Sequence, residues 1–238
     1  MIVIPMAGRS QRFYDAGYDR PKYELELSGL SVFAHAVGSF QAMFAATPFL
    51  FIASAEAADF VRREARGLGI AAFEVVTLAG PTAGQAETVE RGLEASGWNG
   101  ALTIFNIDTF RPGFAFPGAP LAEADGWLEV FCGSGPNWSY VRPAPAGPWA
   151  LETAEKRPIS NLCCTGLYHF ARAGDFRDAL AAERAAPQAA ELYVAPLYNH
   201  LIARGARIGW RLIPPEAVVF CGVPAEYEAL KAATGTPP

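Results

Sequence analysis

Residues 2–22 read Ile-Val-Ile-Pro-Met-Ala-Gly-Arg-Ser-Gln-Arg-Phe-Tyr-Asp-Ala-Gly-Tyr-Asp-Arg-Pro-Lys. The stretch opens with an apolar run that contains β-branched side chains, which predicts a buried strand. The run stops at Ala7 and Gly8, where small residues let the backbone come close to a ligand. A turn of small residues directly after a first strand presents free N–H groups that can cradle phosphate. The N-terminus therefore predicts a strand followed by a phosphate-binding loop.

Positive charge is concentrated in the same segment. The whole chain has a formal net charge of -5 at pH 7, yet this segment contains Arg9, Arg12, Arg20 and Lys22. Each cation alone is typical of a solvated loop, whereas their combination with the strand and the small-residue turn favours phosphate binding. The segment matches neither the Gly-x-Gly-x-x-Gly fingerprint of dinucleotide-binding proteins nor the Gly-x-x-x-x-Gly-Lys-Ser/Thr pattern of P-loop proteins.

Length and composition limit the protein class. At 238 residues and 51% hydrophobic composition, the chain can bury the core of one α/β domain, whereas two full domains would be cramped. It has no long basic run, so we expect small-molecule partners and no nucleic acid. No apolar run approaches the roughly 20 residues that span a bilayer, and no basic region precedes an apolar core at the N-terminus. We therefore expect a soluble, cytoplasmic protein without a membrane partner.

Cysteine and histidine spacing does not predict a metal site. The four cysteines have no C-x-x-C spacing, and we expect reduced thiols in the core. The three histidines are isolated and are interpreted as structural, and no Gly-x-Ser-x-Gly elbow occurs. These residues are Cys132, Cys163, Cys164, Cys221, His35, His169 and His200.

Strand and helix patterns alternate through the first half of the chain. After the first strand, the predicted strands are 49–53, 73–78 and 101–106. The predicted helices are 31–44, 54–68 and 85–95. Ser31 is the predicted cap of the first helix and Ser54 that of the second. This alternation predicts an α/β fold in which a mostly parallel sheet has helices on both faces.

The second half has a different texture. Pro and Gly are frequent from 113 to 147, where the alternating runs 127–131 and 138–142 predict hairpin strands inserted in or appended to the sheet. The later predicted strands are 161–170, 207–213 and 218–221, and the later predicted helices are 175–183, 191–203 and 226–233. The final Thr-Pro-Pro, residues 236–238, predicts a frayed tail.

Ligands of open α/β sheets bind beyond the carboxyl ends of the strands. Asp108 follows the predicted strand 101–106, and a carboxylate there can hold Mg²⁺ or cap the following turn. In the segment 82–88, Gly84 lets a base approach the backbone and Gln85 offers a donor and an acceptor. A plain helix start is the alternative interpretation of that segment.

The N-terminal signature resembles that of the sugar-phosphate nucleotidyltransferases, in which a Gly-rich turn with an Arg is followed by a variable insert and Pro-Lys. The corresponding residues are Met6–Phe13, Gly17-Tyr18 and Pro21-Lys22. The resemblance extends from Ile2 to about Leu230 and implies a Rossmann-like nucleotide-diphospho-sugar transferase fold with a small β-hairpin extension. It implies one nucleotidyltransferase domain, 1–238, with a nucleotide-binding half at about 1–110 and an acceptor-binding half at about 111–238.

The resemblance also implies a reaction. A nucleoside monophosphate would pass from a nucleoside triphosphate (NTP) to a sugar phosphate or related phosphate ester, with Mg²⁺ as cofactor and release of pyrophosphate, for capsule or other surface polysaccharide. Arg12 would hold the triphosphate, Lys22 would hold the α-phosphate beside the incoming phosphate, and Asp108 would carry the metal. The implied nucleotide-binding positions are Ala7, Gly8, Arg9, Ser10, Gly84 and Gln85. The implied acceptor-binding positions are Glu155, Lys156, Thr165, Gly166 and Glu191.

One feature of the family is absent. The family has a second metal-binding Asp two residues before the Gly of a Gly-Thr-Pro turn, and Phe220 occupies that position here, before Gly222. Water and triphosphate could complete the metal shell, Glu216 could substitute, or the metal step could be weakened. A non-catalytic nucleotide or nucleotide-sugar binding module therefore stays the alternative.

A glycosyltransferase is disfavoured because Asn106 replaces the first carboxylate of Asp-x-Asp. The base, the acceptor and the oligomeric state, homo-oligomers included, stay open.

Overall fold

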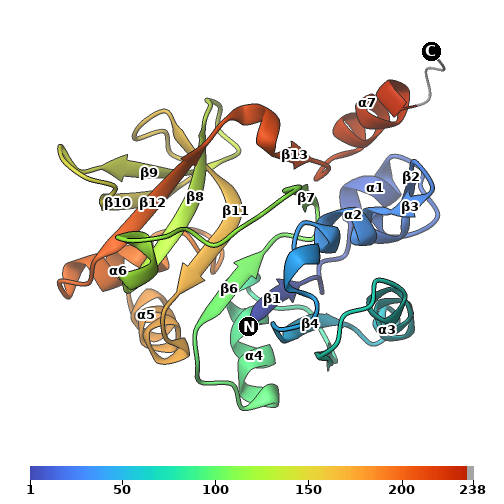
Figure 1. Cartoon of the computed structure of the whole chain (residues 1–238), viewed down its shortest axis with the longest axis horizontal. Coiled ribbons are helices and arrows are strands. Elements are labelled where there is room, and N and C mark those ends of the chain that lie inside the picture. The colour runs from blue at the N-terminus through green and yellow to red at the C-terminus, as the bar shows by residue number, and fades with distance from the viewer. Residues whose placement is uncertain (235–238) are drawn as a thin grey trace.

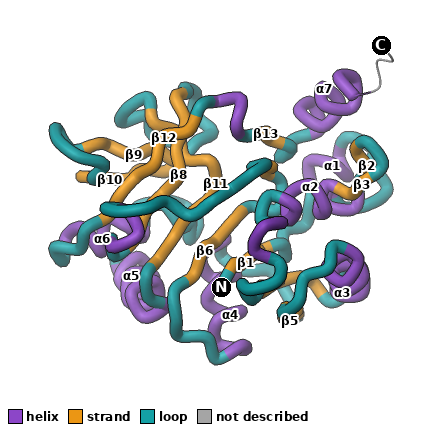
Figure 2. Tube along the Cα trace, viewed as in Figure 1, coloured by secondary structure: helices purple, strands orange, loops and turns teal. Residues whose placement is uncertain are grey.

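A nine-stranded sheet runs through the computed structural model, which describes residues 1–234 (Figures 1 and 2). The main strand order is β10-β9-β11-β6-β1-β4-β5, while β8 pairs with β11 and β12 pairs with β8. The strands of this sheet are β1 (Ile2–Pro5), β4 (Phe49–Ser54), β5 (Phe73–Leu78), β6 (Leu102–Phe105), β8 (Gly126–Cys132), β9 (Ser139–Pro143), β10 (Ala150–Glu155), β11 (Leu162–Phe170) and β12 (Ile208–Ile213). Two small ribbons pair β2 (Glu26–Leu27) with β3 (Leu30–Ser31) and β7 (Thr109–Phe110) with β13 (Val219–Phe220).

The helices connect and cover these strands. In the described part of the chain they are α1 (Gln11–Asp15), α2 (Val32–Gly38), α3 (Ala58–Gly67), α4 (Gln85–Ser96), α5 (Ala173–Ala185), α6 (Leu197–Ala203) and α7 (Pro224–Thr234). Short 3₁₀ turns are η1 (Lys22–Glu24), η2 (Gln41–Met43), η3 (Leu121–Glu123) and η4 (Pro215–Ala217).

Strand β1 lies at the centre of the sheet and is buried on both faces. It pairs in parallel with β4 and with β6, and β5 extends the parallel part beyond β4. Ile2 and Ile4 pack into one core cluster, and Val3 packs into the other. Successive strand residues point to opposite faces, so a strand covered on both sides must be apolar along its length. The strand predicted from the N-terminal run is confirmed.

Helices cover both faces of the sheet, as predicted. The core cluster on one face contains side chains of α2 and α3 packed against β1 and β4. The cluster on the other face contains side chains of α4, α5 and α6. The predicted α/β class, with a mostly parallel central sheet between helices, is therefore confirmed.

The second half of the chain extends the sheet with antiparallel pairs. Strand β11 runs antiparallel to β6 and also to β8, and β12 runs parallel to β8. The run 127–131 is confirmed as a strand within β8, and the run 138–142 as β9, which begins one residue later, at Ser139. The hairpin partner of β9 is β10, a strand that the sequence pattern did not predict.

Some predicted helix boundaries are wrong. Ser31 caps α2, because its Oγ accepts a hydrogen bond of 3.0 Å from Ala34 N, but α2 ends at Gly38. Ser54 is the last residue of β4, and α3 begins at Ala58 without a side-chain cap. The helix predicted from residue 191 begins only at Leu197, where Pro196 sets its start.

Three further predictions concern single features. The frayed tail predicted at 236–238 lies outside the described residues. All four thiols are free, but only Cys163, Cys164 and Cys221 are buried, so the prediction of a core thiol is wrong for Cys132, which is exposed. Within residues 1–234, no helix combines the length and the apolar character that crossing a bilayer requires.

We expect acid to destabilise the protein through His169. The His169 ring stacks on Trp127 at a centroid distance of 5.3 Å, and its Nδ1 lies 2.9 Å from Thr103 Oγ1. Burial, and to a lesser degree the charge of the Met1 amino group, lowers the pKa of His169 to about 4. The unfolded chain takes up this proton near pH 6.5, so the free energy of unfolding should fall by on the order of 3 kcal/mol between pH 6.5 and pH 4.

Denaturant unfolding at several pH values measures this loss. A His169→Gln variant should have a shallower slope in the same pH window, because glutamine takes up no proton. An identical slope in the two proteins would show that other groups cause the acid sensitivity.

Candidate active site

The loop after β1 carries exposed backbone and two exposed cations. Gly8, Arg9 and Arg12 are exposed, and Ala7 and Ser10 are half-buried. Within residues 1–234, no ion pair involves either guanidinium of this loop. Guanidinium groups without a protein carboxylate, next to accessible N–H groups, suit an oxyanion ligand such as phosphate.

Ser10 connects this loop to Lys22. It has φ 51°, in the left-handed region that costs energy for a residue other than glycine. Its Oγ accepts a hydrogen bond of 3.2 Å from Lys22 N. This bond holds the backbone of Lys22 against the loop, so the strained turn of Ser10 helps to place the Lys22 side chain.

Lys22 and Asp108 form an ion pair across the sheet end. Lys22 Nζ donates to Asp108 Oδ2, and the two side chains are 20% and 21% exposed. Asp108 follows β6, and its carbonyl accepts a hydrogen bond of 2.8 Å from Cys221 N, which fixes its backbone to the C-terminal part of the chain. The pair joins the first loop to the end of the next parallel strand, and both groups are still reachable from solvent.

Phe220 contributes packing to this region. Its ring lies 4.6 Å from Trp138 and 5.2 Å from Phe131, centroid to centroid, in a small aromatic cluster. Gly222 instead approaches Asp108, because a Cβ placed there would lie 3.1 Å from Asp108 Oδ2. The position that carries an Asp in the family therefore holds an apolar side chain that is engaged with other aromatic rings.

A second carboxylate near Gly222, besides that of Asp108, belongs to Glu226. A Cβ on Gly222 would lie 3.7 Å from Glu226 Oε2, and that oxygen accepts hydrogen bonds from Gly222 N at 2.8 Å and Val223 N at 3.2 Å. These bonds form the cap of α7. Glu216 lies exposed on η4. The structure therefore gives no support to Glu216 as the substitute ligand.

The donor set fits one kind of metal. In residues 1–234, no group of three or more His, Cys, Asp and Glu side chains could hold an ion by itself. Mg²⁺ is bound in many sites through only one or two carboxylates together with substrate phosphates and water. The accessible carboxylate of Asp108 fits a Mg²⁺ ion that arrives with a phosphate ligand.

Gly84 is required by a neighbouring segment of backbone. It has φ 151°, and a Cβ at this position would lie 2.5 Å from Leu192 O. Two hydrogen bonds hold the two chain segments together, from Leu192 N to Ala83 O at 2.9 Å and from Ala86 N to Leu192 O at 2.8 Å. The backbone that comes close to Gly84 in the structure is therefore that of Leu192.

A Gly84→Ala substitution should destabilise the protein by about 2 kcal/mol, because its Cβ meets fixed backbone and its φ is positive. Chemical denaturation measures the loss. Gly80→Ala in the same loop is the matched control, since a Cβ at Gly80 meets no atom within 4 Å. Equal stability of the two variants would contradict the steric role of Gly84.

Asn106 links the two halves of the site and was missed as a site residue from sequence. Its Oδ1 accepts a hydrogen bond of 2.6 Å from Gln85 Nε2. Its side chain also lies over Gly166 of β11, where a Cβ would come within 2.3 Å of Asn106 Nδ2. Only glycine leaves room for this amide, and Gly166 also has φ 93°, a backbone conformation that other residues rarely adopt. The place of Asn106, at the end of a predicted strand, was the available signal.

The residues predicted for the acceptor form a second polar group. Lys156 has φ 54°, and its Nζ donates to Tyr193 OH, which in turn donates to Glu191 Oε1 at 3.0 Å. The bond to Tyr193 raises the pKa of Lys156. Ser139 Oγ donates to Glu155, and burial raises the pKa of the Glu155 carboxyl although Ser139 and Lys156 oppose this shift. A strained non-glycine residue among paired charges is typical of a functional site.

Thr165 differs from the other predicted acceptor residues. Its side chain is buried, and its Oγ1 donates to Glu129 O at 3.3 Å. Gly166 follows it and faces Asn106. The predicted site residues therefore form two clusters, one around Lys22 and Asp108 and one around Lys156 and Glu191. The Thr165 hydroxyl points into the protein instead.

Solved structures of three other proteins resemble this chain over nearly its whole length. A nucleoside-diphosphate-sugar pyrophosphorylase from Vibrio cholerae RC9 has 50% sequence identity over 98% of this chain and 100% of that chain, with a TM-score of 0.93. A putative glucose-1-phosphate thymidylyltransferase from Bacillus anthracis, in complex with a sucrose, has 17% identity, coverage of 100% and 95%, and a TM-score of 0.75. The inositol-1-phosphate CTP transferase from T. maritima has 15% identity, coverage of 100% and 97%, and a TM-score of 0.73.

The last two similarities concern the fold alone, because the identities are low. No protein-family model and no curated protein sequence matches the chain. The similarity at 50% identity therefore carries most of the information about ancestry.

Proposed function

Since the chain belongs to the sugar-phosphate nucleotidyltransferase family, we propose that it joins a nucleoside monophosphate from an NTP to a sugar phosphate or related phosphate ester and releases pyrophosphate. The observation that carries the proposal is the ion pair of Lys22 with Asp108, beside the exposed cations of the first loop. This arrangement offers one cation and one metal-binding oxygen at the same place, which is what phosphoryl chemistry between two anions needs.

The first loop binds the triphosphate in this proposal. The N–H groups of residues 7–10 and the guanidinium of Arg12 hold its β- and γ-phosphates, and Lys22 turns from Asp108 toward the α-phosphate. Asp108 would hold Mg²⁺, which would supply positive charge to the phosphate oxygens. An oxygen of the acceptor phosphate then attacks the α-phosphorus, and the bond from that phosphorus to the bridging oxygen of pyrophosphate breaks. The attacking oxygen is already anionic, so no general base is required.

The acceptor lies on the other cluster. Lys156 is the cation among the predicted acceptor residues and suits the acceptor phosphate, while Glu155 and Glu191 can accept hydrogen bonds from hydroxyl groups. Residues of about 1–110 then bind the nucleotide, and those of about 111–238 bind the acceptor. The proposed product is an activated sugar or related ester for capsule or other surface polysaccharide, made in the cytoplasm where NTPs are available.

One observation favours a second candidate function. Phe220 places an aromatic ring where the family carries its second metal carboxylate, and a protein that only binds a nucleotide or nucleotide-sugar would tolerate this loss. Conversely, binding alone does not require Lys22 next to Pro21, which supports the catalytic proposal.

Pyrophosphate release tests both candidates. The purified protein is incubated with Mg²⁺, one of the four common ribonucleoside triphosphates or deoxythymidine triphosphate, and one member of a panel of sugar 1-phosphates and small alcohol phosphates. Release with one pair, and none from the Lys22→Ala variant, is the expected result and identifies the substrates. Nucleotide binding without release from any pair would overturn the proposal in favour of the binding module.

A further inference from the structure

Residues 187–196, here termed the bridging segment, connect α5 to α6 and touch both the predicted base-binding segment 82–88 and the acceptor cluster around Lys156 and Glu191. On the nucleotide side, Leu192 exchanges two backbone hydrogen bonds with the segment from Ala83 to Ala86. On the acceptor side, Tyr193 accepts a hydrogen bond from Lys156 Nζ and donates one to Glu191. Any displacement of the bridging segment therefore changes contacts with the predicted base-binding segment 82–88 and with the acceptor cluster together.

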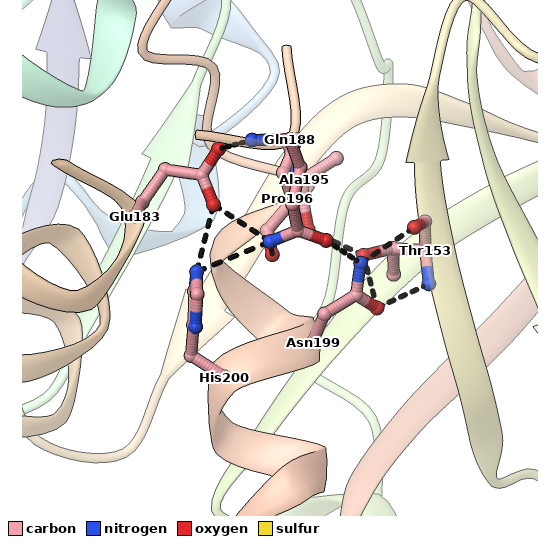
Figure 3. A network of polar contacts seen from close by, with 7 residues as sticks. All are labelled: Thr153, Glu183, Gln188, Ala195, Pro196, Asn199 and His200. Atoms are coloured by element: carbon pink, nitrogen blue, oxygen red, sulfur yellow. Dashed lines mark hydrogen bonds and ion pairs between the residues drawn. The ribbon is translucent and has the colours of Figure 1, made fainter. Parts of the chain in front are cut away.

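Gln188 holds the beginning of the bridging segment (Figure 3). Its backbone N donates to Glu183 Oε1 at 2.7 Å, and its Nε2 donates to Glu183 Oε2 at 2.6 Å and to Pro196 O at 3.2 Å. Its Oε1 accepts a hydrogen bond of 2.6 Å from Asn199 Nδ2. One side chain thus ties the first part of the segment to its last residue and to the two flanking helices.

Asn199 connects the same network to β10. Its Oδ1 accepts from Thr153 N at 2.7 Å, and its Nδ2 donates to Thr153 O at 2.8 Å. Strand β10 is at the edge of the sheet, so its outward N–H and C=O groups have no strand partner, and the amide of Asn199 pairs with both. Thr153 Oγ1 also donates to Ala195 O at 2.6 Å. The strand that carries Glu155 is therefore held by the same residues as the bridging segment.

Glu183 is the charged centre of the network. It is 1% exposed, and its Oε2 lies 2.7 Å from His200 Nε2. A carboxylate oxygen accepts, so His200 Nε2 carries the hydrogen. The 3.1 Å contact between His200 Nε2 and Gln188 Nε2 is therefore between two donors and is not a hydrogen bond. Charge-assisted hydrogen bonds to a buried carboxylate are stronger than neutral ones.

We propose that Glu183, Gln188 and Asn199 are positioning residues that fix the bridging segment and thereby set both substrate sites at once. The inference rests on the proposed function, because it assigns the two clusters to nucleotide and acceptor. None of the three side chains touches the site residues Lys22, Asp108 or Lys156 in the structure, so their effect passes through the segment.

Gln188→Ala is the decisive variant. Gln188 is exposed, and its truncation leaves Glu183 paired with His200, so the buried charge keeps a partner. The matched control is Asn99→Ala, which removes an exposed amide that is bonded to Arg177 on α5 and lies outside the network.

Two readouts test the proposal. Hydrogen exchange at the amides of Leu192 and Ala86 should accelerate about fivefold to tenfold in Gln188→Ala, because the three hydrogen bonds of the Gln188 side chain no longer restrain the segment. The KM values for the NTP and for the acceptor should both rise about fivefold, with kcat within about twofold of wild type. Asn99→Ala should match wild type in both readouts.

The outcomes separate the two proposals. Unchanged exchange at both amides, or a rise in only one KM, overturns the positioning role, and so does exchange that accelerates equally throughout the protein. If the wild type releases no pyrophosphate, the proposed function fails, while exchange together with calorimetric titration of an NTP still decides whether Gln188 positions the segment.

Discussion

Lys22→Ala should lower kcat by about a thousandfold and change the dissociation constant of the NTP by less than about threefold. The ammonium group of Lys22 lies at the junction of the first loop and Asp108, where the proposed mechanism places the charge that develops on the transferred phosphoryl group. In that mechanism, the loop N–H groups and Arg12 would still hold the triphosphate in the variant. A group that acts mainly on developing charge contributes to the transition state much more than to ground-state binding.

Steady-state pyrophosphate release and calorimetric titration with a non-hydrolysable NTP analogue separate the two effects. The control is Arg66→Ala, which removes an exposed cation from the last turn of α3 and should leave both quantities unchanged. Comparable losses of turnover and of nucleotide affinity in Lys22→Ala would count against the assigned role.

Asp108→Asn should lower kcat by about a hundredfold at saturating nucleotide and shift the Mg²⁺ requirement to higher concentration. The amide keeps the size of the side chain but removes the negative charge that pairs with Lys22 and that binds a hard cation. The other carboxylate beside Gly222 is that of Glu226, whose Oε2 already accepts hydrogen bonds from Gly222 N and Val223 N.

A titration of turnover against Mg²⁺ measures this prediction. Glu226→Gln is the informative control, since its side-chain oxygen can still accept from Gly222 N and Val223 N and keep the cap of α7. We expect Glu226→Gln to retain activity within about threefold. A loss as large as that of Asp108→Asn would show that Glu226 acts as the second carboxylate.

Local patterns predicted much of the fold. Strand β5 has the predicted bounds 73–78, and Ser31 caps α2 as its position suggested. Such features depend on a few neighbouring residues, because a strand needs an apolar run and a cap needs one side-chain oxygen beside free N–H groups. The phosphate-binding role of Arg9 and Arg12, which are exposed, stays a prediction.

Errors arose where distant parts of the chain compete with local preference. Ser54 looked like a helix cap, but pairing with β5 keeps it in β4. Residues 191–196 looked helical, but the bonds of Leu192 to Ala83 and Ala86 hold that part of the chain outside a helix. A polar edge strand such as β10 carries little hydrophobic signal, and its pairing with β9 is visible only in the structure.

The sequence by itself determined the α/β class, the first strand with its loop of small residues, and the absence of an Asp at position 220, because these depend on residue identity and short-range periodicity. Only the tertiary structure decided that Lys22 meets Asp108, that Phe220 packs on Trp138, and that Leu192 fills the space beside Gly84. These contacts join residues far apart in the chain. Their geometry follows from strand register and core packing, which no local pattern encodes.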